Sequence, residues 1–172
     1  MLRVKRIASF TAFLSALVVF ASSAHAADIG GTISSTLTIT ADSQLVDDVT
    51  CAVTAGAPCI AIGAPNVRLD LNGFTMTGQA DPQTGCSGAA TPGEIGIEVN
   101  AQSNVLVVGP GLVQRFRAHG IRLLNSTGVK VTAVTMSTNC SSGIIVQGGS
   151  LNEVEGNTAI QNGNLGAPCG GI

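Results

Sequence analysis

The chain has 172 residues, with eight Lys and Arg against ten Asp and Glu, and a formal net charge of −2. It contains no Trp, no Tyr and five Phe, so any core must be filled mainly by aliphatic side chains. The few basic residues cannot neutralise a row of phosphates, which argues against a nucleic-acid partner.

The first 26 residues have the three parts of a secretory signal peptide. The apolar part is shorter than the roughly 20 residues that cross a bilayer, so an uncleaved anchor is the weaker alternative. We expect cleavage after Ala26, a secreted, periplasmic or cell-surface protein without a membrane span, and a formal charge of −5 for the rest of the chain, which has five basic and ten acidic residues. The three parts are a basic start with Arg3, Lys5 and Arg6, an uncharged stretch over residues 7–20, and the small residues of Ala24-His25-Ala26.

Residues 27–55 are predicted to form an N-terminal cap. Residues 36–40 alternate Thr with aliphatic residues, as a half-buried strand does, and Leu45-Val46-Asp47-Asp48 follows. The stretch differs from the later repeat of Gly and aliphatic residues, and a repeating fold needs an atypical terminal unit to close its core.

The next segment has two short strands and an exposed loop. Residues 59–62 are mostly apolar, residues 67–71 alternate strictly, and Asn72-Gly73 is a turn signal. Residues 78–92 are rich in Gly, Ala, Pro and polar residues, which predicts a long loop leaving one corner of the fold.

A repeat of about two dozen residues begins after this loop. The dipeptide Gly-Ile recurs at intervals of 24, 23 and 28 residues, and its first three copies each open a short strand. A second strand follows, and one aliphatic position in it recurs at intervals of 24 and 23 residues. A third short strand is expected at 112–113, 134–136 and 158–160. The repeated glycines are Gly96, Gly120, Gly143 and Gly171, and the repeated aliphatic residues are Val107, Val131 and Val154.

Three short strands per repeat predict an all-β fold, a single-stranded right-handed parallel β-helix. Each turn of such a solenoid has an apolar face that only the turn stacked about 4.8 Å above can bury. Gly and Asn are expected at the corners because both tolerate positive φ, and some Asn side chains can stack as ladders. We expect about four to five rungs over residues 56–172.

The C-terminus lacks a cap. The chain stops at Gly171-Ile172, where the next rung would begin, so an open apolar end would be left exposed. We therefore expect the sequence to be C-terminally incomplete, and a small protein that dimerises through this end is the alternative.

Residues 67–76, which read VRLDLNGFTM, resemble the V-x-L-D-L-N-G-x-x-I opening of bacterial right-handed β-helix repeat proteins of the pectin-lyase-like superfamily. The Gly-Ile rungs and Gly156-Asn157-Thr158 are similar to their repeats, so the resemblance covers roughly residues 30–172. It implies the fold but hardly the function, because this fold hosts lyases, hydrolases, epimerases and adhesins. In the polysaccharide lyases, outward acids hold Ca²⁺ beside a basic Arg or Lys.

Outward strand positions are therefore where catalytic residues are sought. Asp70 is a single acid, and Ca²⁺ needs six to eight oxygen ligands, so no cofactor is expected unless a missing C-terminal part supplies an acid cluster. The pair Glu98 and Arg122 should lie on neighbouring rungs, either in a sugar-binding face or, the more ordinary interpretation, as a surface ion pair. The weak catalytic candidates are Arg68, Asp70, Glu98, Arg122, Glu153 and Glu155.

Two further candidates have an ordinary and a catalytic interpretation. Glu153 and Glu155 are about 6.6 Å apart by strand rise, which a glycoside hydrolase permits, but a solvated edge is the more frequent arrangement. His119 precedes Gly120 at a corner and could act as a general acid or base, although a lone His is usually a surface residue.

Five cysteines outside the cytoplasm predict disulfides with one cysteine left over. Cys140 and Cys169 lie just before successive Gly-Ile pairs, in the same corner of adjacent rungs, and are expected to pair. Cys51 and Cys59 could close a loop at the cap. Cys86, in the long loop, is then the cysteine that these two pairs leave without a partner.

Three functions remain open at this point. The first is an exported binding or scaffold protein that is associated with carbohydrate and whose specificity the sequence does not give. The second is the N-terminal fragment of a polysaccharide lyase or glycoside hydrolase, and the third is a surface adhesin or passenger segment. The missing acid cluster and the scarcity of aromatic residues for sugar stacking argue against the enzyme, so the first is favoured.

Overall fold

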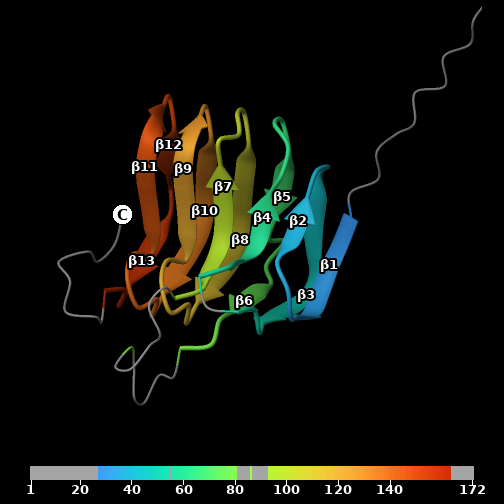
Figure 1. Ribbon diagram of the computed structural model, residues 1–172, viewed down its shortest axis with the longest axis vertical. Helices are drawn as coiled ribbons and strands as arrows, with labels where there is room; N and C mark the ends of the chain where they lie inside the picture. Colours follow the sequence, from blue (N-terminus) through green and yellow to red (C-terminus); the bar gives the residue numbers. More distant parts are fainter. Residues whose placement is uncertain (1–26, 55, 81–85, 87–92, 164–172) are drawn as a thin grey trace, which may run out of the picture.

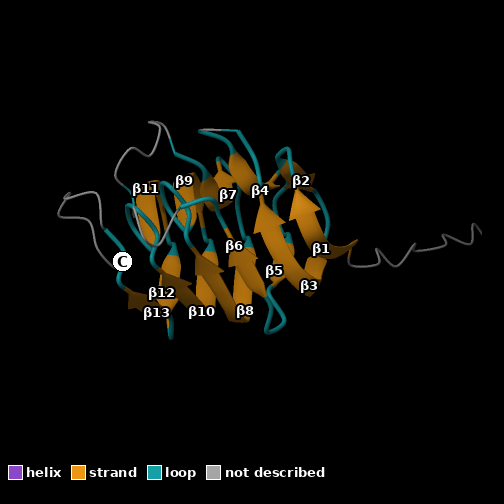
Figure 2. Ribbon diagram, turned by 90° about the horizontal axis from the view of Figure 1, so that it is seen from below, coloured by secondary structure: helices purple, strands orange, loops and turns teal. Residues whose placement is uncertain are grey.

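The computed structural model describes residues 27–54, 56–80, 86 and 93–163. In these residues the chain is all β, with thirteen strands and no helix, and every strand pairing is parallel. The strands form two sheets, one above the other in Figure 2, and the chain alternates between them. The predicted signal peptide, Gly171-Ile172 and most of the 78–92 loop lie outside the described residues.

The larger sheet has eight strands, and its path from β1 to β12 runs from right to left in Figure 1. Its order is β1-β3-β5-β8-β10-β12, while β6 pairs with β3 and β8, and β13 pairs with β10. The strands are β1 (Ala27–Ile33), β3 (Ser43–Cys51), β5 (Arg68–Asp70), β6 (Thr75–Thr77), β8 (Leu106–Gln114), β10 (Lys130–Ser137), β12 (Glu153–Glu155) and β13 (Thr158–Ile160).

The smaller sheet has five strands in the order β11-β9-β7-β4-β2. One coil consists of a strand of this sheet and the strand or strands of the larger sheet that follow it in the chain, for example β7 and then β8. The strands of each coil pair with those of the coil before it. The strands are β2 (Leu37–Ile39), β4 (Pro58–Ile62), β7 (Ile95–Asn100), β9 (Ile121–Thr127) and β11 (Ile144–Ser150).

The register between coils agrees with the sequence repeat. Val131 pairs with Val107 on one side and with Val154 on the other, as the 24- and 23-residue intervals predict. Ile121 likewise pairs with Ile97 and with Ile144. Valine and isoleucine favour extended backbone, and their alternation with polar residues places one row of aliphatic side chains between the two sheets.

The third strand of each repeat also exists, but it belongs to the same sheet as the second. In β8 and β10 the two predicted strands are continuous, and the register shifts between Thr132 and Val134. Such a bulge bends a strand without ending it. These two coils therefore each have one bent strand in the larger sheet, whereas the coils of β5 with β6 and of β12 with β13 have two separate strands there.

The predicted N-terminal cap is mostly a regular part of the stack. β2 pairs with β4, and β3 pairs with both β5 and β6, in the same manner as later coils. Only β1 departs from the repeat, because it adds an edge strand to the larger sheet without a partner strand in the smaller one.

The recurring Gly of Gly-Ile has a steric cause. A Cβ on Gly96 would lie 2.4 Å from the carbonyl oxygen of Gly120, and a Cβ on Gly120 would lie 2.6 Å from that of Gly143. These glycines do not have positive φ, so our expectation that Gly serves the corners through its dihedral freedom is wrong for them. They are required because the backbones of successive coils approach closely here.

Asparagine has two roles at the corners. Asn104 and Asn125 adopt positive φ, as expected. Others bind the preceding coil through their amides, and the side chain of Asn139 also donates to that of Asn162 at 2.9 Å, which is one step of the predicted ladders. Asn152, Asn157 and Asn162 each accept a hydrogen bond from a backbone N–H 23 residues earlier and donate one to a carbonyl 26 residues earlier, at distances of 2.8–3.1 Å.

Candidate functional site

The outer face of the smaller sheet brings Glu98 and Arg122 together. They are paired in register on β7 and β9, and Nε of Arg122 lies 2.6 Å from Oε2 of Glu98. Ile145 follows on β11, so the charged column ends after two coils. The predicted ion pair is therefore present.

His119 lies at the corner beside this ion pair. Its Nδ1 accepts a hydrogen bond of 3.3 Å from the backbone N–H of Ser142. Partial burial lowers the pKa of His119 below 6.5, and the nearby Arg122 guanidinium lowers it further. The imidazole is thus neutral and half-buried, with one ring nitrogen occupied by the main chain.

The other candidate residues form two small clusters on the outer face of the larger sheet. Arg68 lies 2.6 Å from Asp70. Asp70 also accepts a hydrogen bond from the backbone N–H of Asn72, as expected for the turn. Two coils further along the stack, Lys130 forms ion pairs with Glu153, at 3.2 Å, and with Glu155.

Both glutamates are engaged by the same lysine. Hydrogen bonds from Lys130 to Glu155 and Glu153 raise the pKa of that lysine above 10.5. The two carboxylates share one cation on an exposed edge, and among the described residues the buried acid is Glu94, which is paired with Arg117 and is not beside them to act as the protonated partner of a hydrolase. Their arrangement is that of a surface charge network.

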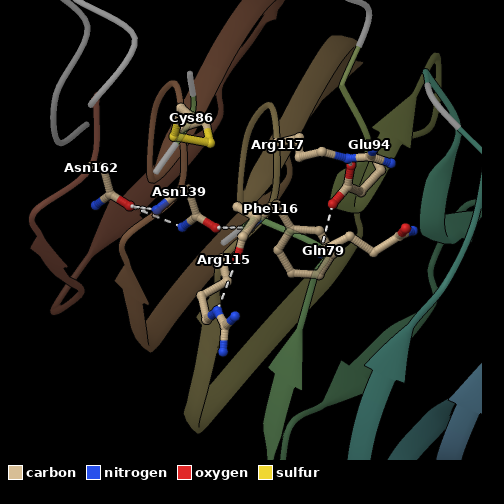
Figure 3. Close-up of a disulfide and its surroundings, with 10 residues drawn as sticks. Gln79, Cys86, Glu94, Arg115, Phe116, Arg117, Asn139 and Asn162 are labelled. Carbon is tan, nitrogen blue, oxygen red and sulfur yellow. Dashed lines mark hydrogen bonds and ion pairs between the residues drawn. A yellow bond between two sulfur atoms is a disulfide. The ribbon is translucent and has the colours of Figure 1, made fainter. Parts of the chain in front are cut away.

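Glu94 and Arg117 form an ion pair that the sequence interpretation missed. The side chain of Glu94 is fully buried, and Figure 3 shows it between Arg117 and Gln79. Its Oε1 accepts a hydrogen bond of 2.8 Å from the backbone N–H of Gln79. The one available signal was the spacing, because residues 94 and 117 are 23 residues apart and so lie on neighbouring coils.

The same corner contains a disulfide that corrects the predicted pairing. Cys140 is bonded to Cys86, not to Cys169, which lies outside the described residues. Cys86 comes from the long loop, whose position the repeat does not fix, and it lies against the corner that contains Cys140 (Figure 3). The expected pair of Cys51 and Cys59 is present, with Cα atoms 5.7 Å apart.

A row of uncharged polar side chains on the larger sheet was also missed. It consists of Thr32, Thr50, Thr77, Gln114 and Ser137, which are consecutive in-register partners from β1 to β10. Their chain neighbours Cys51, Met76, Val113 and Met136 are buried, so strand alternation directs the row outward. We call these five residues the hydroxyl row. Thr and Ser at repeat-equivalent positions were the signal, although the 78–92 insertion obscures it.

Ion pairs or a hydrogen bond hold the five described Lys and Arg side chains in place. Arg68, Arg117, Arg122 and Lys130 each have a carboxylate partner, and Nε of Arg115 donates to the carbonyl of Ala80 at 3.0 Å. Among the residues placed in the structure there is no group of three or more His, Cys, Asp or Glu suited to a metal ion. Nor does that part of the chain contain a helix long and apolar enough to span a membrane.

A hollow of about 260 Å³ lies at the N-terminal end of the stack. It is lined by β1 and β2 and the turn after β2, with Ile29, Leu37 and Ile39 among its apolar residues. It arises because β1 extends the larger sheet by one strand while the smaller sheet ends at β2. None of the candidate catalytic residues lines it.

Comparison of the chain with protein-family models, with curated proteins and with solved structures finds no match in any of the three.

Proposed function

We propose that this is an exported right-handed parallel β-helix protein of the pectin-lyase-like superfamily that binds carbohydrate without cleaving it. The 23- and 24-residue register between parallel coils supports the fold, together with the resemblance of residues 67–76. The basic, apolar and small-residue order of the first 26 residues, along with two disulfides, supports export.

The hydroxyl row carries the proposal of carbohydrate binding. Hydroxyl and amide groups both donate and accept hydrogen bonds, as sugar hydroxyls do, and five of them lie in line on one sheet. A rigid sheet holds such groups at fixed spacing, which lowers the entropy lost when a ligand binds.

The charged residues favour binding over catalysis. Each candidate acid on a described strand is neutralised by a neighbouring cation, and Glu94 is enclosed within the fold. Cleaving a glycosidic bond, either by β-elimination at a uronate residue or by hydrolysis, requires acid and base groups that face the sugar. A polysaccharide lyase or hydrolase would have to place such groups elsewhere.

Co-sedimentation with insoluble polysaccharides tests the proposal. The purified protein should pellet with at least one of cellulose, chitin, β-1,3-glucan or calcium-crosslinked polygalacturonate, and not with polystyrene beads coated with albumin. Prolonged incubation should release neither reducing ends nor unsaturated uronates. Failure to pellet with any of the four would refute carbohydrate binding, and release of products would establish an enzyme instead.

Two separate measurements test the fold and the export. N-terminal sequencing of protein collected outside the cytoplasm of the producing cells should begin at Ala27. A crystal structure should give coils of right-handed sense. An intact Met1 or a left-handed stack would each contradict the corresponding part of the proposal.

A further inference from the structure

We propose that the hydroxyl row is the ligand-contact surface, and that its ligand is an uncharged, unbranched polysaccharide lying along the stack of coils. The inference rests on the proposed carbohydrate binding, to which it adds the class of polysaccharide and its direction. The row is Thr32, Thr50, Thr77, Gln114 and Ser137.

The direction follows from the register. Neighbouring strands are about 4.8 Å apart, so five in-register side chains extend over about 19 Å along the stack. Across the strands the row is narrow, because it lies where strands end: β6 ends at Thr77, β8 at Gln114 and β10 at Ser137. A ligand along the stack can contact all five residues, whereas one across it would contact the two outward positions of a single coil.

The side chains of the hydroxyl row have restricted orientations that suit hydrogen bonding to a ligand. Nε2 of Gln114 donates to Oγ1 of Thr77 at 3.2 Å, which fixes both side chains and leaves the Thr77 hydroxyl proton directed elsewhere. Threonine is stiff at χ1, so few rotamers are lost on binding. Leu112, in the adjacent outward column, offers a partly exposed apolar surface for the C–H face of a sugar.

The surrounding charges favour a neutral ligand. The row itself is uncharged, and the nearest outward acid on the neighbouring column, Asp48, uses Oδ1 to accept a hydrogen bond from the N–H of Thr75. A carboxylate there repels uronate groups. Of the five described Lys and Arg residues, four have their charge balanced by an acid, while Arg115 keeps its charge and donates Nε to the carbonyl of Ala80.

Valine substitutions test the contact surface because valine keeps the shape and β propensity of threonine while removing the hydroxyl. We expect Thr50→Val with Thr77→Val to weaken binding to cellulose, chitin or β-1,3-glucan at least tenfold. The matched control is Thr38→Val with Thr127→Val, which makes the same change at exposed positions of the smaller sheet and should leave binding unchanged. Thermal unfolding of both variants should resemble that of the unmodified protein.

The outcomes separate the two proposals. Binding to a neutral polysaccharide that is lost in the row variant and kept in the control supports the inference, as does affinity for soluble oligosaccharides that rises with length until the row is filled. Binding to polygalacturonate alone, or to neutral polysaccharide with equal strength in both variants, overturns the inference while carbohydrate binding stands. If nothing binds, both proposals fail. If the row variant unfolds, Thr50→Ser with Thr77→Ser should retain binding, and its loss overturns the inference.

Discussion

At the scale of single residues, Glu94 is the charged side chain that the described fold buries completely, and such burial costs free energy unless the charge is paired. Its carboxylate is removed from water and depends on Arg117 and on the N–H of Gln79. Glu94→Ala should lower the free energy of unfolding by about 3 kcal/mol, near the lower end for a broken buried ion pair, because Arg117 is 22 % exposed and can be partly hydrated. Urea unfolding followed by circular dichroism measures the change.

Two further variants make this prediction specific. Glu94→Gln keeps a hydrogen-bond acceptor for Gln79 and should lose less than Glu94→Ala. Glu153→Ala removes a carboxylate of the exposed network around Lys130 and should hardly move the midpoint. Equal losses for Glu94→Ala and Glu153→Ala would show that burial of Glu94 is not what matters.

His119 makes stability depend on pH. Because burial and Arg122 lower its pKa, the unfolded chain takes up a proton near pH 6.5, whereas the folded chain does so only at lower pH. The unfolded state therefore binds more protons just below pH 6.5, and stability falls as pH decreases through this range. Protonation also removes the lone pair that accepts from Ser142.

The comparison with His119→Gln isolates this effect from the carboxylates, which titrate in both proteins. Urea unfolding at pH 7.5 and at pH 5.5 should show a larger loss of stability in the unmodified protein than in the variant. Identical losses would mean that His119 does not contribute.

At the scale of strands and corners, Asn139 is a buried hydrogen-bonding link between coils. It accepts from the N–H of Phe116 at 3.0 Å and donates to the carbonyl of Val113 at 3.2 Å, in a buried site that Figure 3 shows beside Asn162. Asn139→Ala leaves both groups without a partner and should cost about 3 kcal/mol. Asn100→Ala, at an exposed end of β7, should stay within about 0.5 kcal/mol in the same urea titration.

The elements were largely predictable from the sequence because a stacked coil imposes the same demand on each repeat. Val107, Val131 and Val154 recur since one inward position must be filled in every coil, and the register confirms it. The function of Gly120 was misjudged because the contact that requires it is with Gly143, a coil away. Periodicity shows which positions are equivalent, but not which atoms meet there.

At the scale of the whole molecule, what the sequence could not reveal lies where the repeat is interrupted. Arg68 with Asp70 and Glu98 with Arg122 were placed correctly because they lie on regular strands. Cys86, Glu94 and Gln79 flank or belong to the 78–92 insertion, and no spacing rule says where an insertion returns. The hydroxyl row was missed for the same reason, since the insertion separates Thr77 from Gln114.

The disulfide to this insertion should contribute more to stability than the disulfide near the N-terminus. Cys86 and Cys140 are separated by 54 residues and Cys51 and Cys59 by 8, so loop-closure entropy predicts about 4 and about 2.5 kcal/mol. Urea unfolding of two double variants, Cys86→Ala with Cys140→Ala and Cys51→Ala with Cys59→Ala, measures both.

The order of these losses is the informative result. Both Cys51 and Cys59 are buried in the main core, whereas Cys86 and Cys140 form a separate small cluster with Ala80. If packing alone determined the effect, the pair in the main core would cost more to remove. A larger loss for Cys86 and Cys140 would instead show that the insertion is held to the stack chiefly by this covalent link, because the unfolded chain gains the greater freedom when the longer loop is opened.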